Sequence, residues 1–200
     1  MEPVSHPLAG KLAALRDHLP PGRRILIVPH DFPDPDALAS SAAFHVLLDR
    51  HFGVHSQIAF SGEVSRAENK ELLRRLRCRW HRLADLRQPR RAGFDCILVD
   101  TAPWSRNVTL PEEARVLAVF DHHEYRARAQ LTGLFTDIRQ EAGATTTIAH
   151  QYLKAAGIEP PRWLAAIMAY AIASETLDLT REVSDVDLRA YVDLISQADL

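Results

Sequence analysis

Short apolar runs alternate along the chain with longer segments whose apolar residues recur at helical spacing. Three continuous runs, 25–28, 96–99 and 116–120, are typical of strands buried on both faces, and 54–60 and 131–138 are less regular strand candidates. The segments with helical spacing are 8–19, 37–51, 69–79, 143–156, 160–174 and 185–196. Because strands alternate with helices without hairpin signals, the pattern predicts an α/β fold with a parallel sheet flanked by helices on both faces.

Acidic and imidazole side chains follow three of these predicted strands. They are His30, Asp34 and Asp36 after 25–28, Asp100 after 96–99, and Asp121, His122 and His123 after 116–120. The carboxyl ends of parallel strands meet at one edge of a sheet, so we expect these side chains to converge. Burying them there is costly unless they bind something, and the pattern therefore predicts a metal site.

The types of side chain and their spacing narrow the chemistry of this site. Imidazole together with carboxylate favours manganese, iron or zinc, whereas carboxylates alone favour magnesium. Asp34 can cap the helix that follows it, with Pro35 at the first helical position. Asp34 and Asp36 can point at two different ions, and Asp100 is suited to bridge them. Two ions about 3.5–4 Å apart clamp a phosphoryl group and activate a bridging water, so the reaction requires no serine or cysteine nucleophile.

Composition sets limits on the class of protein. A chain of 200 residues with a net charge of -2 suits one globular domain, and its charge points to neither nucleic acid nor a membrane surface. No apolar run approaches the roughly 18 residues of a membrane span, and the first ten residues lack the pattern of a signal peptide. Two cysteines do not form a disulfide framework. We therefore expect a cytoplasmic protein with no membrane partner.

Five ordered motifs resemble those of the DHH phosphoesterases. They are 30–37 (HDFPDPDA), 99–101 (VDT), 121–123 (DHH), 143–145 (GAT) and 171–176 (AIASET). Their order and spacing agree with the family from about residue 24 to the end of the chain. The nearest resemblance is to the branch of nano-RNA exonucleases and phosphoadenosine phosphate phosphatases. Single-strand DNA exonucleases, cyclic dinucleotide phosphodiesterases and family II inorganic pyrophosphatases are more distant.

The resemblance implies a site for two Mn²⁺ ions, with Mg²⁺, Co²⁺ or Fe²⁺ as alternative metals. It implies that one ion is held by His30, Asp34 and Asp100, and the other by Asp36, Asp100 and His122. It implies a catalytic role for Asp100, as the bridge, and for His123, as a ligand or as a proton and charge partner beside the scissile phosphate. Asp121 is expected to orient an imidazole.

The chain departs from the family pattern in three places. Glu175 stands where the fourth motif usually has Asp, and we prefer Glu175 as the ligand over Asp178, which lies about one helical turn further on. Glu124 follows the DHH segment where the nearest relatives often have Pro, and Arg126 or Arg128 would have to neutralise it beside a phosphate. The sequence ends at Leu200, before the smaller substrate-binding domain that is usual in the family.

From this last departure we expect a single DHH catalytic domain over residues 1–200, with the C-terminal substrate-binding domain absent or truncated. Such a domain should retain metal binding but have weak activity, because the wall that grips the far end of the substrate is missing. Neither the oligomeric state nor the polarity of cleavage is encoded in these motifs.

Substrate contacts are expected from three polar residues, Arg126, Asn107 and Thr145, the last at a helix start that offers N–H groups to an anion. An arginine-rich region is either a guide for a nucleic-acid backbone or, more often for such runs, a solvated surface; its members are Arg74, Arg75, Arg77, Arg79, Arg82, Arg87, Arg90 and Arg91. Trp104 is a candidate for a wall of the site, and Trp80 is expected to pack under its helix.

These observations predict a manganese-dependent phosphodiesterase or phosphatase that hydrolyses short oligonucleotides or nucleotide phosphates through a two-metal-activated water. Hydrolysis of inorganic pyrophosphate or polyphosphate is the alternative within enzymes. Aromatic and arginine residues near the predicted site favour a nucleotide over it, because pyrophosphate needs only cations. A non-catalytic nucleotide-binding module with a decayed site is the contrasting class, and the complete set of histidine and aspartate ligands argues against it.

Overall fold

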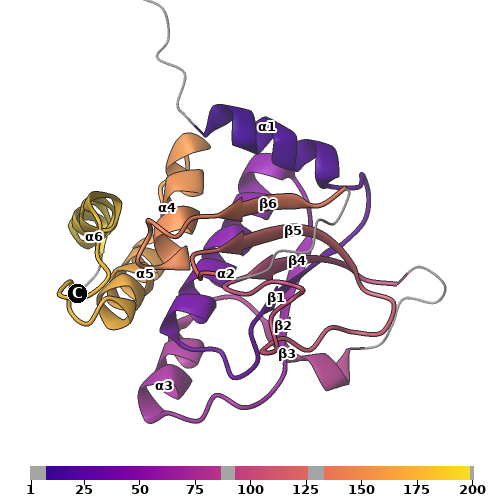
Figure 1. The fold of residues 1–200 in the computed structure, drawn as a ribbon, viewed down its shortest axis with the longest axis horizontal. Coiled ribbons are helices and arrows are strands. Elements are labelled where there is room, and N and C mark those ends of the chain that lie inside the picture. The colour runs from indigo at the N-terminus through magenta and orange to yellow at the C-terminus, as the bar shows by residue number, and fades with distance from the viewer. Residues whose placement is uncertain (1–7, 87–92, 126–132, 199–200) are drawn as a thin grey trace, which may run out of the picture.

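The computed structural model describes residues 8–86, 93–125 and 133–198, and six strands in it form one sheet. The strands are β1 (Ile25–Pro29), β2 (Ser56–Phe60), β3 (Trp80–Arg82), β4 (Asp95–Val99), β5 (Arg115–Asp121) and β6 (Phe135–Ile138). All neighbouring strands are parallel, in the order β3-β2-β1-β4-β5-β6 (Figure 1). The α/β fold with a parallel sheet is therefore confirmed.

Six α-helices accompany the sheet at the expected places in the chain. They are α1 (Ala9–His18), α2 (Pro35–Leu47), α3 (Ala67–Arg75), α4 (Thr145–Ala155), α5 (Arg162–Glu175) and α6 (Asp185–Gln197). The expected start of α2 is confirmed, because the Asp34 carboxylate accepts a hydrogen bond from the Ala37 N–H at 3.0 Å and Pro35 is the first helical residue. No helix in the three described ranges is both long and apolar enough to cross a bilayer.

The boundary that differs most in its consequence is the end of the third helix. The third helix ends at Arg75 instead of continuing to 79, and Trp80 then lies in β3, an edge strand that the sequence pattern does not reveal. A strand of three residues is too short to show an alternation of apolar and polar positions. Trp80 is partly buried and packs with its ring edge against Phe60, so it belongs to the core of the sheet edge.

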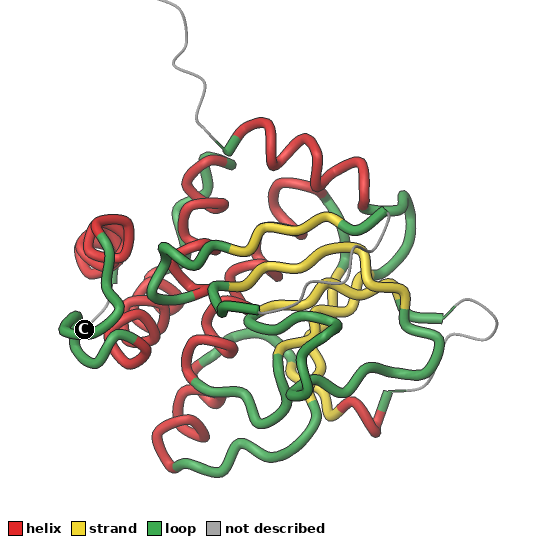
Figure 2. The backbone as a smooth tube through the Cα atoms, viewed as in Figure 1, coloured by secondary structure: helices red, strands yellow, loops and turns green. Residues whose placement is uncertain are grey.

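The two faces of the sheet are covered differently (Figure 2). Ile25 and Ile27 of β1 face the larger apolar core, which also contains the buried residues of the α-helices. Leu26 and Val28 face a smaller core that is covered by loops and by a 3-10 helix over Leu83–Asp85. Within the described residues, loops and this short helix cover the second face, where we expected helices, because a continuously apolar strand shows that both faces are buried but not by what.

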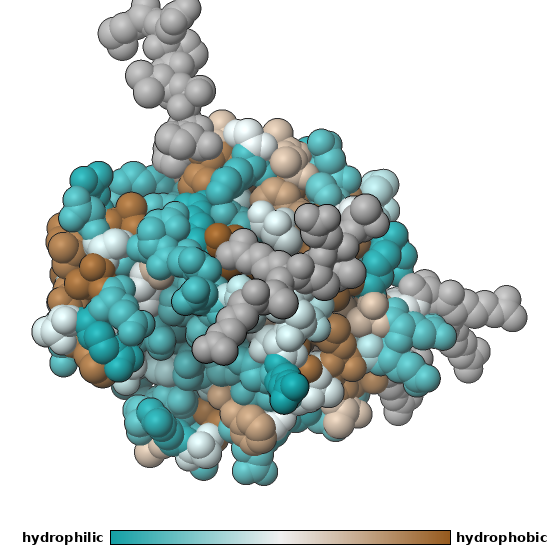
Figure 3. All heavy atoms as spheres, viewed as in Figure 1, coloured by the Kyte–Doolittle hydropathy of each residue, from teal (hydrophilic) through white to brown (hydrophobic). Residues whose placement is uncertain are grey.

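The viewed surface is mostly hydrophilic, and apolar atoms gather on it over α5 and α6 (Figure 3). The large apolar side chains that are exposed on these two helices are Tyr170, Leu188 and Val192.

The start of α4 is fixed by a buried carboxylate from α6. Asp187 accepts hydrogen bonds from the Gly143 N–H at 2.9 Å, the Thr147 hydroxyl at 2.6 Å and the Ser184 N–H at 2.8 Å. Gly143 tolerates no side chain, because a Cβ there would clash with the carbonyl oxygen of Glu182. The loop from β6 to α4 is therefore held rigidly next to the ends of the central strands.

The edge strand β6 is tied to two helices by the buried carboxylate of Asp137. It accepts hydrogen bonds from Lys11 of α1 at 2.6 Å, from the Arg139 Nε at 2.9 Å and from the Tyr152 hydroxyl of α4 at 2.8 Å. Burial alone would raise the pKa of Asp137, but the hydrogen bonds from Arg139 and Lys11 outweigh it and lower the pKa. The ionised carboxylate is thus the stable form in the folded protein.

We predict that Asp137→Asn lowers the free energy of unfolding by about 2–4 kcal/mol at pH 7, because it leaves buried donors without their ionic partner. Since the folded pKa lies below the unfolded value of about 3.9, the stabilisation is present above pH about 4 and is lost as the pH falls through the folded pKa. Urea unfolding of both proteins between pH 3 and 7 tests this. A difference that does not shrink below pH about 4 would contradict the assigned ionisation.

Candidate metal centre

His30 follows β1 and turns one ring nitrogen towards two carboxylates. Its Nδ1 lies 2.7 Å from the Asp31 carbonyl oxygen, which fixes the orientation of the ring. Its Nε2 lies 3.6 Å from Asp34 Oδ2 and 3.5 Å from Asp100 Oδ2. His30, Asp34 and Asp100 thereby form one compact group of nitrogen and oxygen atoms that could hold a metal ion.

His122, after β5, is oriented in the same way. Its Nδ1 lies 3.3 Å from the carbonyl oxygen of Ala142, and its Nε2 lies 3.6 Å from Asp100 Oδ1 and 3.9 Å from Asp36 Oδ2. This Nε2 is buried and has no hydrogen-bond partner among the described residues. A buried nitrogen that is left unpaired among carboxylates is expected where a cation binds.

Asp100 is common to both sides of the site. One of its carboxylate oxygens faces His30 and the other faces His122, and the residue is 2% exposed. Its backbone has a φ of 60°, an uncommon value for a residue other than glycine. The Asp100 N–H donates to the Phe120 carbonyl oxygen at 2.8 Å and thus holds this conformation. The chain accepts local strain to direct the carboxylate between the two imidazoles.

Asp36 is fully buried at the first turn of α2 and faces the N-terminus of α4. Its two oxygens accept hydrogen bonds from the backbone N–H groups of Thr145 and Thr146 at 2.7 and 2.8 Å. Burial, and then the charges of Asp100 and Asp34, raise the pKa of Asp36 well above its usual range. The helix N-terminus alone therefore does not compensate the crowded negative charge.

The third residue of the DHH segment, His123, is held by the first. The Asp121 carboxylate accepts hydrogen bonds from the N–H groups of His122 and His123 at 2.7 and 3.1 Å, and from the His123 Nδ1 at 2.8 Å. The Tyr125 hydroxyl donates to its other oxygen. The hydrogen bond that His123 donates to Asp121 is the main cause that raises the pKa of His123 to about 9. His123 is half exposed and forms a second compact group with Asp100 and His122.

Glu175 and Asp178 differ clearly in their relation to the site. Glu175 is the last residue of α5 and is half-buried, and its pKa is raised by burial and then by the charges of Asp34 and Asp100. Asp178 lies beyond the helix and is exposed. Neither belongs to the two compact groups. Glu175 is therefore close enough to interact electrostatically with the proposed ligands.

The spacing of the imidazole and carboxylate atoms suits a bound cation better than it suits direct hydrogen bonds between these side chains. Metal ions lie about 2.0–2.2 Å from imidazole nitrogen and carboxylate oxygen, which spaces neighbouring ligand atoms about 3–3.5 Å apart. The imidazole and carboxylate atoms here are 3.5–3.9 Å apart, longer than hydrogen bonds and near this spacing. A helix N-terminus stabilises an anion by about 0.3–1 kcal/mol. Two carboxylates about 4 Å apart repel by about 4 kcal/mol at an effective dielectric constant of 20, so cations are needed to balance the cluster.

In the absence of a metal, the imidazole of His30 attracts a proton. Burial lowers the pKa of His30, but its interactions with Asp100 and Asp34 outweigh this effect and raise the pKa to about 11. The same carboxylates that hold a proton on His30 would attract a divalent cation to it.

The expected substrate residues lie in three different situations. Thr145 was expected to contact the substrate. It is instead fully buried, and its hydroxyl donates to Asp100 Oδ1 at 2.8 Å, so it orients a proposed metal ligand. The Asn107 side chain accepts a hydrogen bond from the Thr101 hydroxyl at 2.8 Å and lies in the exposed loop after β4. Arg126, like Arg128, falls outside the described residues.

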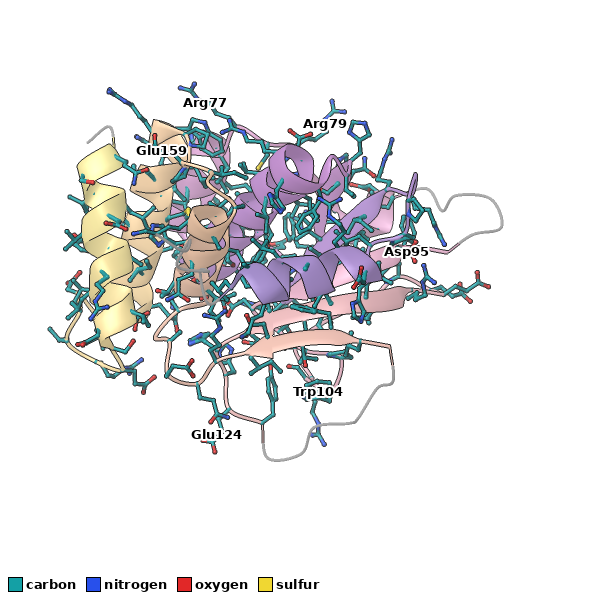
Figure 4. All side chains as sticks on the ribbon, turned by 90° about the horizontal axis from the view of Figure 1, so that it is seen from above. Arg77, Arg79, Asp95, Trp104, Glu124 and Glu159 are labelled. Atoms are coloured by element: carbon teal, nitrogen blue, oxygen red, sulfur yellow. The ribbon has the colours of Figure 1, made fainter. Side chains whose placement is uncertain are left out.

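The cleft beside the DHH segment is lined by His122, His123, Glu124, Gln140, Glu141, Ala142, Glu182, Val183 and Ser184. Glu124 and Trp104 lie on the same side of the molecule, and Arg77 and Arg79 lie on the opposite side (Figure 4). Arg74 and Arg75 pair with Glu71 of their own helix. Of the arginine-rich region, 87, 90 and 91 are outside the described ranges. The other five members are exposed and fit a solvated surface, and the Arg82 guanidinium among them lies over the ring of Phe60.

Trp104 is partly buried in the smaller core, where its ring packs edge-on against Tyr125. Trp104 therefore packs against the segment that follows β5. No pattern in the sequence indicates that Tyr125 orients the DHH segment through Asp121, because this contact depends on how the chain turns after β5.

We predict that Glu175→Gln weakens manganese binding by about 10–100-fold, the range for groups that support a metal site. Asp178→Asn is the matched control, because it removes a charge three residues away but exposed, and it should change the affinity by less than about twofold. Calorimetric titration of Mn²⁺ into the metal-depleted proteins measures both. A larger loss in the Asp178 variant would reverse this assignment.

Comparisons with known proteins agree with this geometry. Residues 24–172 match the DHH family, N-terminal domain. The chain is 36% identical over 180 residues to an uncharacterized protein of Methanocaldococcus jannaschii, covering 88% of this chain and 35% of that protein. It is 27% identical over 165 residues to a probable manganese-dependent inorganic pyrophosphatase of Streptococcus pyogenes, covering 81% and 52%. The chain thus spans about a third to a half of these relatives.

Solved structures share the fold. A crystal structure of a Methanococcus jannaschii protein proposed to be a family II inorganic pyrophosphatase superposes with a TM-score of 0.63 at 21% identity, covering 87% of this chain and 56% of that one. The exonuclease RecJ bound to manganese superposes with a TM-score of 0.52 at 15% identity, covering 92% and 46%. The match of residues 24–172 shows that the chain belongs to the DHH family.

Proposed function

We propose that this protein is a metal-dependent phosphoesterase that hydrolyses short oligonucleotides or nucleotide phosphates. The observation that carries the proposal is the position of Asp100, whose two carboxylate oxygens face different histidines at the carboxyl edge of the sheet. One carboxylate between two such groups is the arrangement that suits a bridged pair of divalent ions. Family membership and a relative named for manganese dependence support Mn²⁺ as the metal.

In this proposal the metal ligands are His30, Asp34, Asp36, Asp100, His122 and Glu175. When bound, the two ions would polarise the phosphoryl group and lower the pKa of an attacking water. Backbone carbonyl oxygens hold the rings of His30 and His122 so that each presents its Nε2. Thr145 holds Asp100, and the first N–H groups of α4 hold Asp36. The ligands are therefore oriented before any substrate arrives.

His123 supplies a proton and a positive charge beside the reacting phosphate. Its raised pKa keeps the imidazole protonated near neutral pH, and Asp121 fixes the ring through Nδ1. Because the side chain is half exposed at the cleft, it can meet a phosphate oxygen that arrives from solvent. A protonated imidazole in this position would balance charge on the phosphate or donate a proton to the leaving oxygen.

Hydrolysis of inorganic pyrophosphate or polyphosphate is the second candidate. The relative named as a probable manganese-dependent inorganic pyrophosphatase favours it. A non-catalytic binding module is the third candidate, but the histidine and aspartate side chains that follow β1, β4 and β5 argue against a decayed site.

The testing experiment measures manganese-dependent release of mononucleotide from a 5′-phosphorylated dinucleotide, with pyrophosphate assayed in parallel. His122→Ala should reduce turnover at least about a hundredfold, because the variant lacks a ligand to the activating metal. His55→Ala is the matched control. It removes an exposed histidine that precedes β2, at the amino ends of the strands and away from the proposed ligands, and should leave turnover unchanged.

The outcomes separate the candidates. Dinucleotide cleavage that is lost in His122→Ala supports the proposal, and cleavage of pyrophosphate alone moves the protein to the second candidate. Unchanged turnover in the variant would overturn the two-metal assignment. Purification without a transition metal, together with no cleavage of either substrate, would favour the binding module.

A further inference from the structure

Phe32 is an exposed aromatic residue inside the first ligand motif. It lies two residues after His30 and two before Asp34, and it is 64% exposed. Its φ is 57°, which is a strained value for a bulky side chain. A lone exposed phenylalanine is ordinary, but one that is held at the site in a strained backbone conformation calls for an explanation.

Neighbouring loops hold this conformation from both sides. The Asp31 N–H donates to the Asn107 carbonyl oxygen at 2.6 Å, and the Phe32 N–H donates to the Ser61 carbonyl oxygen at 3.0 Å. The Asp31 carboxylate also accepts hydrogen bonds from the N–H and the hydroxyl of Thr109 at 3.0 and 2.7 Å. The loops after β2 and β4 therefore determine where the ring of Phe32 points.

The ring itself rests on a glycine. A Cβ at Gly62 would lie 2.7 Å from Phe32 Cδ1, so only a residue without a side chain leaves room for the ring there. Gly62 also has a φ of 75°, which favours glycine independently. The ring is thus backed by the turn after β2, while most of its surface faces solvent.

The position in the sheet indicates what could use this ring. β1 and β4 are neighbours in the sheet; the chain goes from β1 to β2 on one side and from β4 to β5 on the other, so the loops after β1 and β4 flank the switch point where open α/β sheets bind ligands. A flat, exposed apolar ring on the loop between two proposed metal ligands suits the π-face of a nucleobase. Inorganic pyrophosphate has no group that would use it.

We propose that Phe32 is the surface on which a nucleobase of the substrate stacks, and that it selects nucleotides over inorganic phosphates. The inference rests on the proposed function and refines it. Trp80 and Trp104, the other aromatic candidates from the sequence, are partly buried in the two apolar cores and are less accessible to a base. In this proposal Phe32 contributes to substrate binding and takes no part in metal binding.

Steady-state kinetics on the dinucleotide test this directly. Phe32→Ala should raise KM about tenfold, the scale of losing one base stack, with kcat and manganese affinity little changed. Phe32→Trp should retain the wild-type KM, because it restores a flat ring. Val192→Ala is the matched control, since it removes an exposed apolar side chain from α6 and should have no effect. Any hydrolysis of pyrophosphate should be equal in all four proteins.

A binding measurement makes the result independent of turnover. In Phe32→Trp the added indole should be quenched by adenosine monophosphate and not by inorganic phosphate, relative to the wild-type fluorescence. If the wild type cleaves the dinucleotide and Phe32→Ala has the same KM, the stacking proposal fails while the proposed function stands. If the wild type cleaves nothing, the proposed function fails, and the quenching still decides whether Phe32 meets a base. Absence of quenching by the nucleotide would overturn the proposal.

Discussion

The carboxylates of Asp34, Asp36 and Asp100 lie close together at the carboxyl edge of the sheet, and their mutual repulsion governs how the site is built. Asp36 and Asp100 are buried, so water cannot screen their charges. Polar groups surround these carboxylates. The N-terminus of α4 donates to Asp36, the Thr145 hydroxyl donates to Asp100, and the imidazoles of His30 and His122 lie next to Asp100. These groups orient the negative charge without cancelling it, which is the condition for binding divalent cations.

The surrounding structure keeps these polar groups in place. Asp187 of α6 holds the loop at Gly143 that leads into α4, and Asp121 holds both histidines of the DHH segment through their backbone N–H groups. Each is a buried carboxylate that accepts several hydrogen bonds, so each fixes the backbone of a loop at the site. The geometry of the site thus depends on residues that contact no metal.

At the switch point of the sheet, the site combines charged side chains with an exposed apolar ring. The ligands present charge, whereas Phe32 presents an apolar ring on the loop between two of them. The strain in that loop is balanced by hydrogen bonds to the loops after β2 and β4. A site that recognised only inorganic phosphate would have no use for this arrangement, and for that reason the ring favours a nucleotide in the comparison of the two candidate substrates.

Local pattern determined the elements and the motif residues of this protein. Apolar runs, Asp34 as a cap and the ordered His and Asp motifs depend on residues near one another in the chain, so the parallel sheet and the candidate ligands could be read directly from the sequence. The tertiary structure decided what depends on distant partners. It showed β3 and the loops that cover one face of the sheet. It also showed the hydrogen bond from Thr145 to Asp100, and that Glu175, rather than Asp178, interacts with the charges of the site. The physical reason is that hydrogen bonds and charge interactions between strand ends exist only once the strand order is set, and no local periodicity specifies that order.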